Sequence, residues 1–267
     1  MKKYWSFFRI RFINSLQYRS AAYAGIATQF FWGIMLILMY RAFYQANPAA
    51  FPMTFQQTST YVWLQQAFLS LFMTYGFDNE LFDLITSGNV AYELVRPMDL
   101  YSMWITKQMA TRMAKAALRC FPVLIFAALL PAPYGLTAPQ DLTSFFMFLV
   151  TLFLGCVTIL AFYMLVYISV FYTLSPMGVR MMTATITDFL AGSLIPIPFM
   201  GEKLQRFIRL TPFAAMQNLP LRIYSGNIAG AEMVSGFILQ LFWLTALVLI
   251  GQLWMGRTLK RVVVQGG

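Results

Sequence analysis

The 267-residue chain contains no histidine, only two cysteines and few charged residues. Without histidine it cannot form His-based catalytic triads, His-ligated metal sites or His proton shuttles. Cys120 and Cys156 each lie in an apolar run, so we expect two buried thiols rather than a disulfide framework. Charged residues make up 10% of the chain, whereas a soluble domain usually has about 25%. This is too little charge to cover the surface of a soluble protein of this length.

Hydrophobic residues make up 60% of the sequence, and the mean hydropathy is +0.66. The formal net charge is +10, which by itself could indicate a nucleic-acid-binding protein. The lysines and arginines, however, flank long uncharged runs instead of clustering between polar stretches, and this is the pattern of membrane proteins. We therefore expect the lipid bilayer, and no nucleic acid, as a partner.

The charged residues separate uncharged runs that are long enough to cross a membrane. A transmembrane helix needs roughly 20 apolar residues to span about 30 Å of hydrocarbon. Six runs meet this length, at residues 20–40, 58–76, 120–140, 145–173, 181–201 and 233–256. The sequence therefore predicts an all-α integral membrane protein, with six transmembrane helices in a single domain over residues 1–267.

The distribution of lysine and arginine predicts the sidedness of these helices. Six spans place both termini on one side, and with the termini inside, 14 of the 19 basic residues are cytoplasmic. The outer five are Arg41, Lys203, Arg206, Arg209 and Arg222. No small-residue cleavage site follows a short apolar core, so we expect no cleavable signal peptide. The predicted location is the cell (inner) membrane, with both termini cytoplasmic.

The N-terminal segment, residues 1–20, is predicted to form a helix that lies in the inner membrane interface. Trp5, Phe8, Phe12 and Leu16 share one side at helical spacing. The alternative is a plain cytoplasmic extension of the first span.

The longest predicted inner segment joins spans two and three, over residues 77–119. Its first part, residues 78–88, has the features of a short helix: Asp78 can cap it, Glu80 suits its N-terminal end, and Gly88 can end it. Five of the nine acids lie in this segment, namely Asp78, Glu80, Asp83, Glu93 and Asp99. An acidic, capped helix facing the cytoplasm could dock a partner protein, although a solvated turn is an equally simple interpretation.

Residues 87–101, SGNVAYELVRPMDLY, resemble the corresponding segment of ABC-type-2 exporter permeases, the membrane subunits of ATP-driven efflux systems. The matching positions are Gly88, Val90, Leu94, Arg96 and Pro97. The resemblance extends to the Tyr18-Arg19 pair and to a proline-rich outer stretch that contains Pro196, Pro198, Phe199, Pro212 and Phe213.

This resemblance implies that residues 78–97 form a coupling segment that docks on an ATP-binding subunit. The implied coupling residues are Asp78, Glu80, Asp83, Leu84, Gly88, Val90, Glu93, Leu94, Arg96 and Pro97. The chain has no G-x-x-x-x-G-K-[ST] motif, so ATP and Mg are expected in a separate ATP-binding cassette subunit. We expect no catalytic residues, cofactor or metal in this chain. A second copy, or a similar permease, would complete a twelve-span pathway.

The outer segment between spans five and six, residues 199–231, has an amphipathic basic pattern. Lys203, Arg206 and Arg209 recur every third residue with apolar residues between them, which predicts a helix at the outer interface. The resemblance implies short outer helices that re-enter the membrane, with the proline-rich stretch as an outer gate. The alternative is a basic loop bound to anionic headgroups.

Asp188 is the one acid within a predicted span. A buried acid costs on the order of 2.5–3.5 kcal/mol on insertion scales, so it should face protein or water. It could line the translocation path or pair with a cation from span three. Alternatively, Thr185, Thr187 or backbone groups could satisfy it structurally.

Two other functions stay open at this point. A secondary transporter or channel would usually show several intramembrane ionisable groups, and this chain has one. A membrane assembly protein is also compatible with the sequence. No residue identifies the transported substrate.

Overall fold

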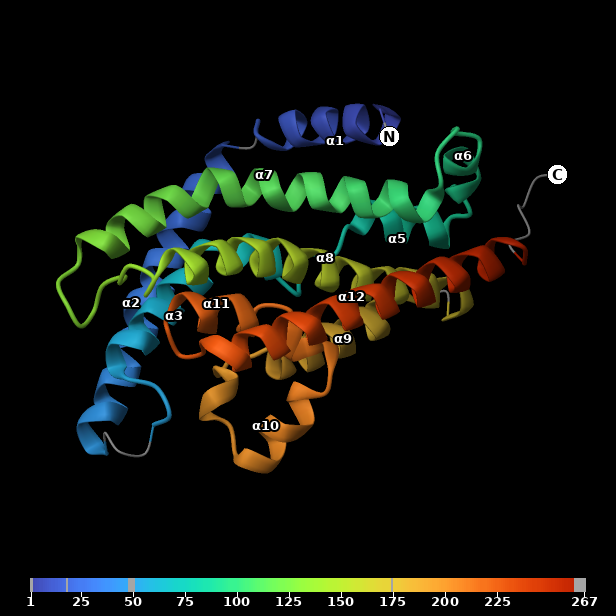
Figure 1. Cartoon of the computed structure of the whole chain (residues 1–267). Helices are drawn as coiled ribbons and strands as arrows, with labels where there is room; N and C mark the ends of the chain where they lie inside the picture. The colour runs from blue at the N-terminus through green and yellow to red at the C-terminus, as the bar shows by residue number, and fades with distance from the viewer. Residues whose placement is uncertain (1, 18, 48–50, 174, 262–267) are drawn as a thin grey trace.

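In a computed structural model of the protein, the structure describes residues 2–17, 19–47, 51–173 and 175–261. Within these residues the chain is entirely helical, without a strand, as predicted. Figure 1 shows long helices packed side by side, with shorter helices at both ends of the bundle. Tyr18, which belongs to the predicted Tyr18-Arg19 pair, lies outside the described residues.

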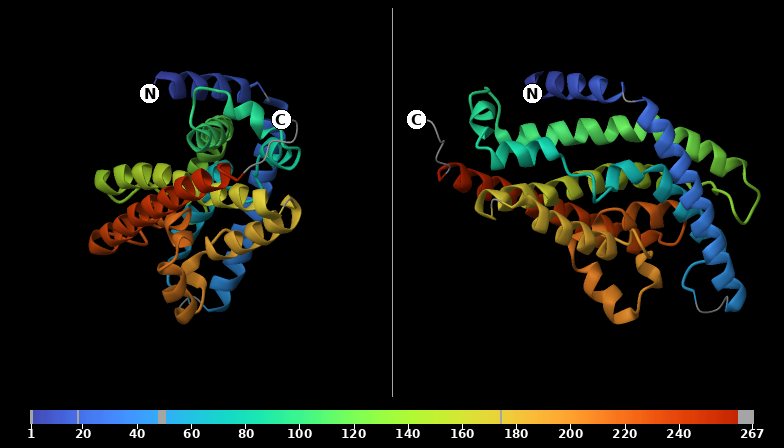
Figure 2. Two further views of the ribbon diagram at one scale, coloured as in Figure 1. Left: turned by 90° about the vertical axis from the view of Figure 1, so that its right-hand side faces the viewer. Right: turned by 180° about the vertical axis from the view of Figure 1, so that it is seen from behind.

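Three helices are long and apolar enough to cross a membrane, over Ala22–Ala46, Leu142–Thr173 and Gly230–Leu259. They correspond to α2 (Arg19–Ala46), α8 (Leu142–Thr173) and α12 (Gly230–Leu259). At 1.5 Å per residue, the 32-residue α8 measures about 48 Å, well beyond the hydrocarbon thickness. Helices α8 and α12 lie side by side in every view of the ribbon (Figures 1 and 2).

The contact between α8 and α12 depends on close backbone approach and buried hydrogen bonds. Gln240 on α12 donates to the carbonyls of Thr151 on α8, at 2.9 Å, and of Ala215, at 2.7 Å. Ala215 belongs to the short 3-10 helix η3 (Pro212–Ala215). Gly155 leaves room for the Met216 carbonyl, because a β-carbon at this position would lie 2.3 Å from that oxygen. A larger residue at 155 would push these elements apart.

The predicted second run is two short helices rather than one long one. Helix α3 (Phe55–Ala67) has 13 residues, and α4 (Leu69–Phe72) follows after a break at Phe68. All residues from Thr58 to Ala67 are buried. Several of their polar groups bond within the protein; for example, the indole of Trp63 donates to the Tyr134 carbonyl at 2.8 Å. Helix α3 is therefore enclosed by other helices, which explains why it is more polar than a lipid-facing helix.

The predicted third run begins earlier than expected and ends sooner. Helix α7 extends over Leu100–Leu129, so it includes twenty residues that the charge pattern assigned to the inner loop. Asp99 caps it by accepting a hydrogen bond from the backbone amide of Ser102 at 2.8 Å. The helix ends before Pro131, which disfavours helix in the residue preceding it. Basic residues do not oppose a helix when their spacing places them on one face, and this is the case on α7.

The predicted fifth run is also shorter in the structure. Helix α9 (Pro176–Leu190) has 15 residues, and Gly192 then adopts a positive φ of 79°. Residues 195–200 form an irregular, proline-rich stretch with the 3-10 helix η2 (Ile197–Phe199). The structure therefore supports three candidate membrane-spanning helices, and six spans are not established by it.

The remaining helices are short and lie around the long ones. They are α1 (Lys2–Ser15), α5 (Asn79–Thr86), α6 (Val90–Leu94), α10 (Glu202–Arg209) and α11 (Asn218–Tyr224). Helix α1 packs against α7, and α11 is buried against α8. Helix α10 protrudes from the opposite side of the bundle from α1 (Figure 1). Cys120 and Cys156 are buried free thiols, as predicted.

Candidate functional site

The candidate site is the connection that contains α5 and α6, together with a basic cavity beneath it. Asp78 directly precedes helix α5 and caps it. Its carboxylate accepts a hydrogen bond from the Glu80 amide at 3.0 Å, so the predicted N-cap is present. Gly88 has a φ of 76°, a left-handed conformation that favours glycine, and it separates α5 from α6. The apolar face of α5, formed by Leu81, Phe82 and Ile85, is buried.

Three helices, α7, α8 and α9, hold the start of α5 in place. Lys107 on α7 forms ion pairs with Asp78 at 2.9 Å and with Glu80 at 2.6 Å. The hydrogen bond from Lys107 is the main reason that the pKa of Glu80 lies below its usual range. The hydroxyl of Tyr167 on α8 accepts from the Asp78 amide at 2.6 Å, and Arg180 on α9 donates to Asn79 at 2.7 Å. Any displacement of α5 is therefore transmitted directly to α7, α8 and α9.

The side of this connection that faces away from the helix bundle is exposed. Tyr92 is 74% exposed and Val95 is 83% exposed, and both lie at or just after α6. Asp83 on α5 is exposed as well, and Glu93 pairs with Arg96 at 3.2 Å. In Figure 1 this segment projects from one end of the bundle, the same end at which α12 finishes. The exposed surface of α5 and α6 thus combines apolar and acidic side chains.

The N-terminal helix is joined to the same connection. Lys3 donates to the carbonyl of Pro97, and the backbone amide of Asp99 donates to the hydroxyl of Tyr4 at 3.1 Å. On the predicted aromatic side, Trp5 stacks on Phe8 with ring centroids 5.6 Å apart. Leu94, Arg96 and Pro97 are exposed beside this contact. The start of α1 and the entrance to α7 therefore form one unit.

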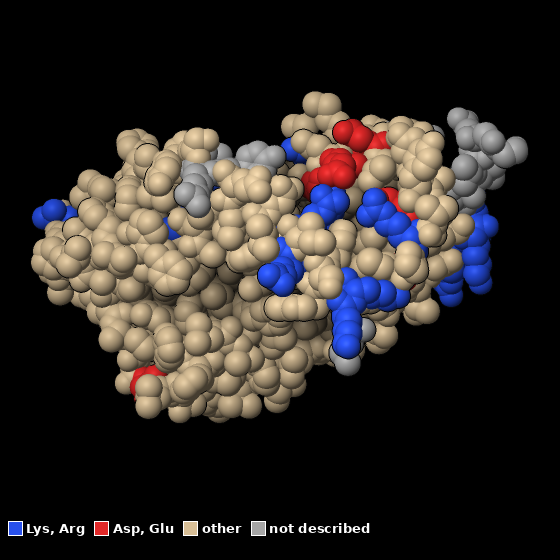
Figure 3. Space-filling view, turned by 90° about the horizontal axis from the view of Figure 1, so that it is seen from above, with Lys and Arg blue, Asp and Glu red and all other residues tan. Residues whose placement is uncertain are grey.

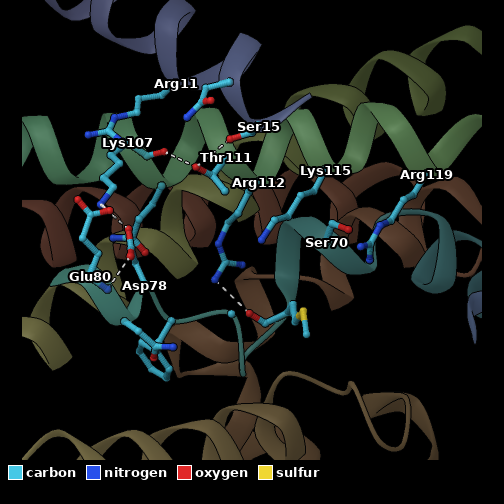
Figure 4. Close-up of a pocket in the computed structure, with 16 residues that line it drawn as sticks. Arg11, Ser15, Ser70, Asp78, Glu80, Lys107, Thr111, Arg112, Lys115 and Arg119 are labelled. Carbon is cyan, nitrogen blue, oxygen red and sulfur yellow. Dashed lines mark hydrogen bonds and ion pairs between the residues drawn. The ribbon is translucent and has the colours of Figure 1, made fainter. Parts of the chain in front are cut away.

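A cavity of about 520 Å³ lies between α1, α5 and α7. Its lining carries five cations and two carboxylates, a formal net charge of +3. The cations are Arg11, Lys107, Arg112, Lys115 and Arg119, and the carboxylates are Asp78 and Glu80. Figure 4 shows Lys107, Arg112, Lys115 and Arg119 extending from α7 to one side. Sequence reasoning assigned these residues to a loop; the three- and four-residue spacing of Arg112, Lys115 and Arg119 was the signal for a common helix face.

Arg112 closes the break that follows α4. Its guanidinium donates to the carbonyls of Leu71 at 2.6 Å and Met73 at 3.0 Å, and it lies 5.1 Å from the ring centroid of Tyr163. These carbonyls lie where α4 ends, so they have no following helical turn to bond them. Arg112 thus connects the interrupted second segment to α7.

Asp188 lies on α9 and is buried. Its carboxylate accepts a hydrogen bond from the hydroxyl of Thr74 at 2.6 Å, a residue of the segment that follows α4. This partner differs from both threonines expected from the sequence. The Thr187 hydroxyl is buried and has no hydrogen-bond partner among the described residues. Asp188 therefore connects α9 to the same interrupted segment that Arg112 holds from the other side.

The predicted outer-gate residues contact different neighbours. Phe199 lies 5.4 Å from Tyr40 and 5.5 Å from Phe51 between ring centroids, whereas Phe213 lies 5.3 Å from Phe162. Pro198 is buried within η2, Pro196 precedes that helix, and Pro212 begins η3.

The outer basic residues are partly neutralised. Arg222, buried in α11, pairs with Glu232 at 3.3 Å, and Arg209 lies 3.9 Å from the same carboxylate. Arg206 pairs with Glu202 one turn earlier on α10. Three of the five basic residues that oppose the predicted sidedness are therefore paired with acids, so the net charge of this region is lower than the number of its basic residues.

Comparison with protein-family models and with curated proteins finds no match to this chain. The functional interpretation consequently depends on the geometry above and on the short motifs of residues 78–97.

Proposed function

We propose that this chain is the permease subunit of an ATP-driven exporter of the ABC-type-2 kind. In this proposal α2, the α3–α4 pair, α7, α8, α9 and α12 are its six membrane passes, and both termini lie in the cytoplasm of the cell (inner) membrane. The observation that carries the proposal is the connection of α5 and α6. The side of this connection that faces away from the bundle is exposed, and the side that faces the bundle is bonded to α7, α8 and α9. A partner that moves this connection would move three helices together.

The distribution of charge supports the proposed sidedness. Figure 3 shows that most charged side chains on this face gather at the end where α1, α5 and α6 lie, while the rest of the face is largely uncharged. Charged groups are expensive in hydrocarbon, so this end belongs in water and at the headgroups. The cations of α7 face a cavity instead of lipid.

The short helices fit this proposal if they lie within the protein. Helices α3 and α9 measure about 20 and 23 Å, less than the roughly 30 Å of hydrocarbon. Non-helical backbone at membrane depth is tolerated where protein encloses it. The buried α3, and the hydrogen bond of Arg112 to the segment that follows α4, meet this condition. Helix α9 buries only Ala184, Thr187 and Asp188.

The proposal extends to the finer assignments. Helix α1 lies at the inner interface. Helix α10 with η2, η3 and α11 forms an outer segment that caps the path, with Pro196, Pro198, Phe199, Pro212 and Phe213 as gate residues. The ATP-binding cassette subunit is a separate chain that holds ATP and Mg, and a second permease completes the pathway.

The first test asks whether the ATP-binding subunit co-purifies with this chain and whether the chain stimulates its ATP hydrolysis. Reversing Asp83 and Glu93 together to lysine should reduce that stimulation about tenfold. The change replaces two acids of the proposed docking segment with cations and removes the ion pair of Glu93 with Arg96, and a combined loss of about 1.4 kcal/mol is a factor of ten. Leu84→Pro should have the same effect, since proline inside a helix costs about 3 kcal/mol.

A matched control reverses Glu202→Lys on α10, at the opposite side of the bundle, where the side chain is 79% exposed. We expect this variant to behave as the native protein. If docking and stimulation survived both the double reversal and Leu84→Pro, the connection of α5 and α6 would not be the coupling element.

A further inference from the structure

The cavity beneath α5 is lined by Lys115, an exposed cation for which the described residues provide no carboxylate partner. The two carboxylates that line the cavity belong to Asp78 and Glu80, and both form ion pairs with Lys107. All nine acidic residues of the chain are described, and none of them lies within ion-pair distance of Lys115. Arg112 bonds to two carbonyl oxygens, which carry only partial charge.

Lys115 lies beside another cation on α7. Arg112 precedes it by three residues, so the two lie on one helix face. Like charges at this spacing destabilise a helix. A bound anion would reduce the repulsion between them.

A second, independent feature of the cavity also indicates a ligand. Ser70 is 5% exposed and lines the cavity, and its hydroxyl has no hydrogen-bond partner among the described residues. In Figure 4 this hydroxyl lies between Lys115 and Arg119. A buried hydroxyl without a partner costs about 1–3 kcal/mol. An oxygen-rich anion held by Lys115 could accept its hydrogen bond.

We propose that this cavity binds a phosphate group, carried either by an anionic lipid of the inner leaflet or by a small soluble organophosphate. Guanidinium and ammonium groups form strong charge-assisted hydrogen bonds to phosphate oxygens. The cavity volume of about 520 Å³ lies within the usual range of ligand sites. The proposal concerns the cavity alone and does not require the ATP-binding partner.

The test uses the full-length protein in nanodiscs of phosphatidylcholine. One arm adds phosphatidylglycerol and measures retained lipid by native mass spectrometry. The other arm titrates glycerol 3-phosphate by calorimetry. Lys115→Gln should weaken binding at least about tenfold, because a hydrogen bond to a charged group contributes about 1.5–3 kcal/mol. Ser70→Ala should weaken it about fivefold, and Lys115→Arg should preserve it.

The matched control is Arg257→Gln with Lys260→Gln, which removes two exposed cations at the end of α12. Binding of phosphatidylglycerol without binding of glycerol 3-phosphate identifies a lipid headgroup as the ligand, and binding of glycerol 3-phosphate identifies a soluble phosphate. In either case Lys115→Gln must reduce the binding, and the double variant of Arg257 and Lys260 must not. Retained binding by Lys115→Arg shows that a cation at this position suffices, and an unchanged unfolding temperature of Lys115→Gln excludes unfolding as the cause of its loss. Equal binding by Lys115→Gln and the control, or no binding in either arm, would overturn the proposal.

Discussion

Replacement of Lys107 with methionine tests whether α5 is held to the bundle by its ion pairs. Methionine keeps most of the volume of the buried stem, since Lys107 is 7% exposed, but it removes the ammonium group. Asp78 and Glu80 would then face each other near the start of α5 without a cation.

The expected cost follows from the exposure of each carboxylate. The Glu80 side chain is 60% exposed, so its pair contributes at most about 1 kcal/mol. The Asp78 side chain is 24% exposed, and its 2.9 Å charged hydrogen bond should contribute about 1–2 kcal/mol. Together these losses amount to about 2–3 kcal/mol of local stability. Amides of α5 should therefore exchange with deuterium about 30- to 150-fold faster in Lys107→Met.

The assay is hydrogen exchange with mass spectrometry on peptides that cover residues 79–87, with Lys260→Met as the exposed control. Glu80→Gln should accelerate exchange no more than about fivefold. The pKa of Glu80 is lowered in the fold from a usual value of 4.5, so its contribution is present above that pH and is lost as the pH falls through the folded pKa. Unchanged exchange in Lys107→Met would refute the reasoning that these pairs anchor α5.

Two further predictions concern the packing of the bundle and the buried acid Asp188. Gly155→Ala should lower the unfolding temperature by several degrees, because the new methyl group would meet the Met216 carbonyl at a cost of about 1–3 kcal/mol. Gly256→Ala should not lower it, because nothing lies within 4 Å of a β-carbon at that position. The measurement is the thermal unfolding of both variants in detergent. Equal unfolding temperatures would show that Gly155 does not make a close contact. Asp188→Asn should keep the fold, since an amide oxygen still accepts from Thr74, and should reduce export. Native transport by this variant would assign Asp188 a structural role.

Features that depend on local sequence could be predicted. The all-helical class, the Asp78 cap and the positive φ of Gly88 each follow from residues within one or two turns of the feature. The buried state of Cys156 follows equally from the apolar run around it.

Features that depend on packing could not be predicted in this way. Thr74 and Asp188 are separated by 114 residues, and no local pattern connects them. The charge of Lys107 indicated a loop because charge marks the ends of membrane helices, yet within α7 its stem is buried and its ammonium is paired. The sequence predicts one continuous span over residues 58–76, and only the enclosure of α3 by other helices explains its glutamines and threonines.

The attachment of α1 imposes an order on biosynthesis. Lys3 bonds to Pro97 and Tyr4 to Asp99, so the contacts span 94 and 95 residues of sequence. At about 5–20 residues per second, the ribosome needs roughly 5–20 s to make the chain between them. During that time α2 and α3 are already made while α1 has no protein surface on which to dock. The N-terminal helix therefore reaches its final place only after the entrance to α7 has been made.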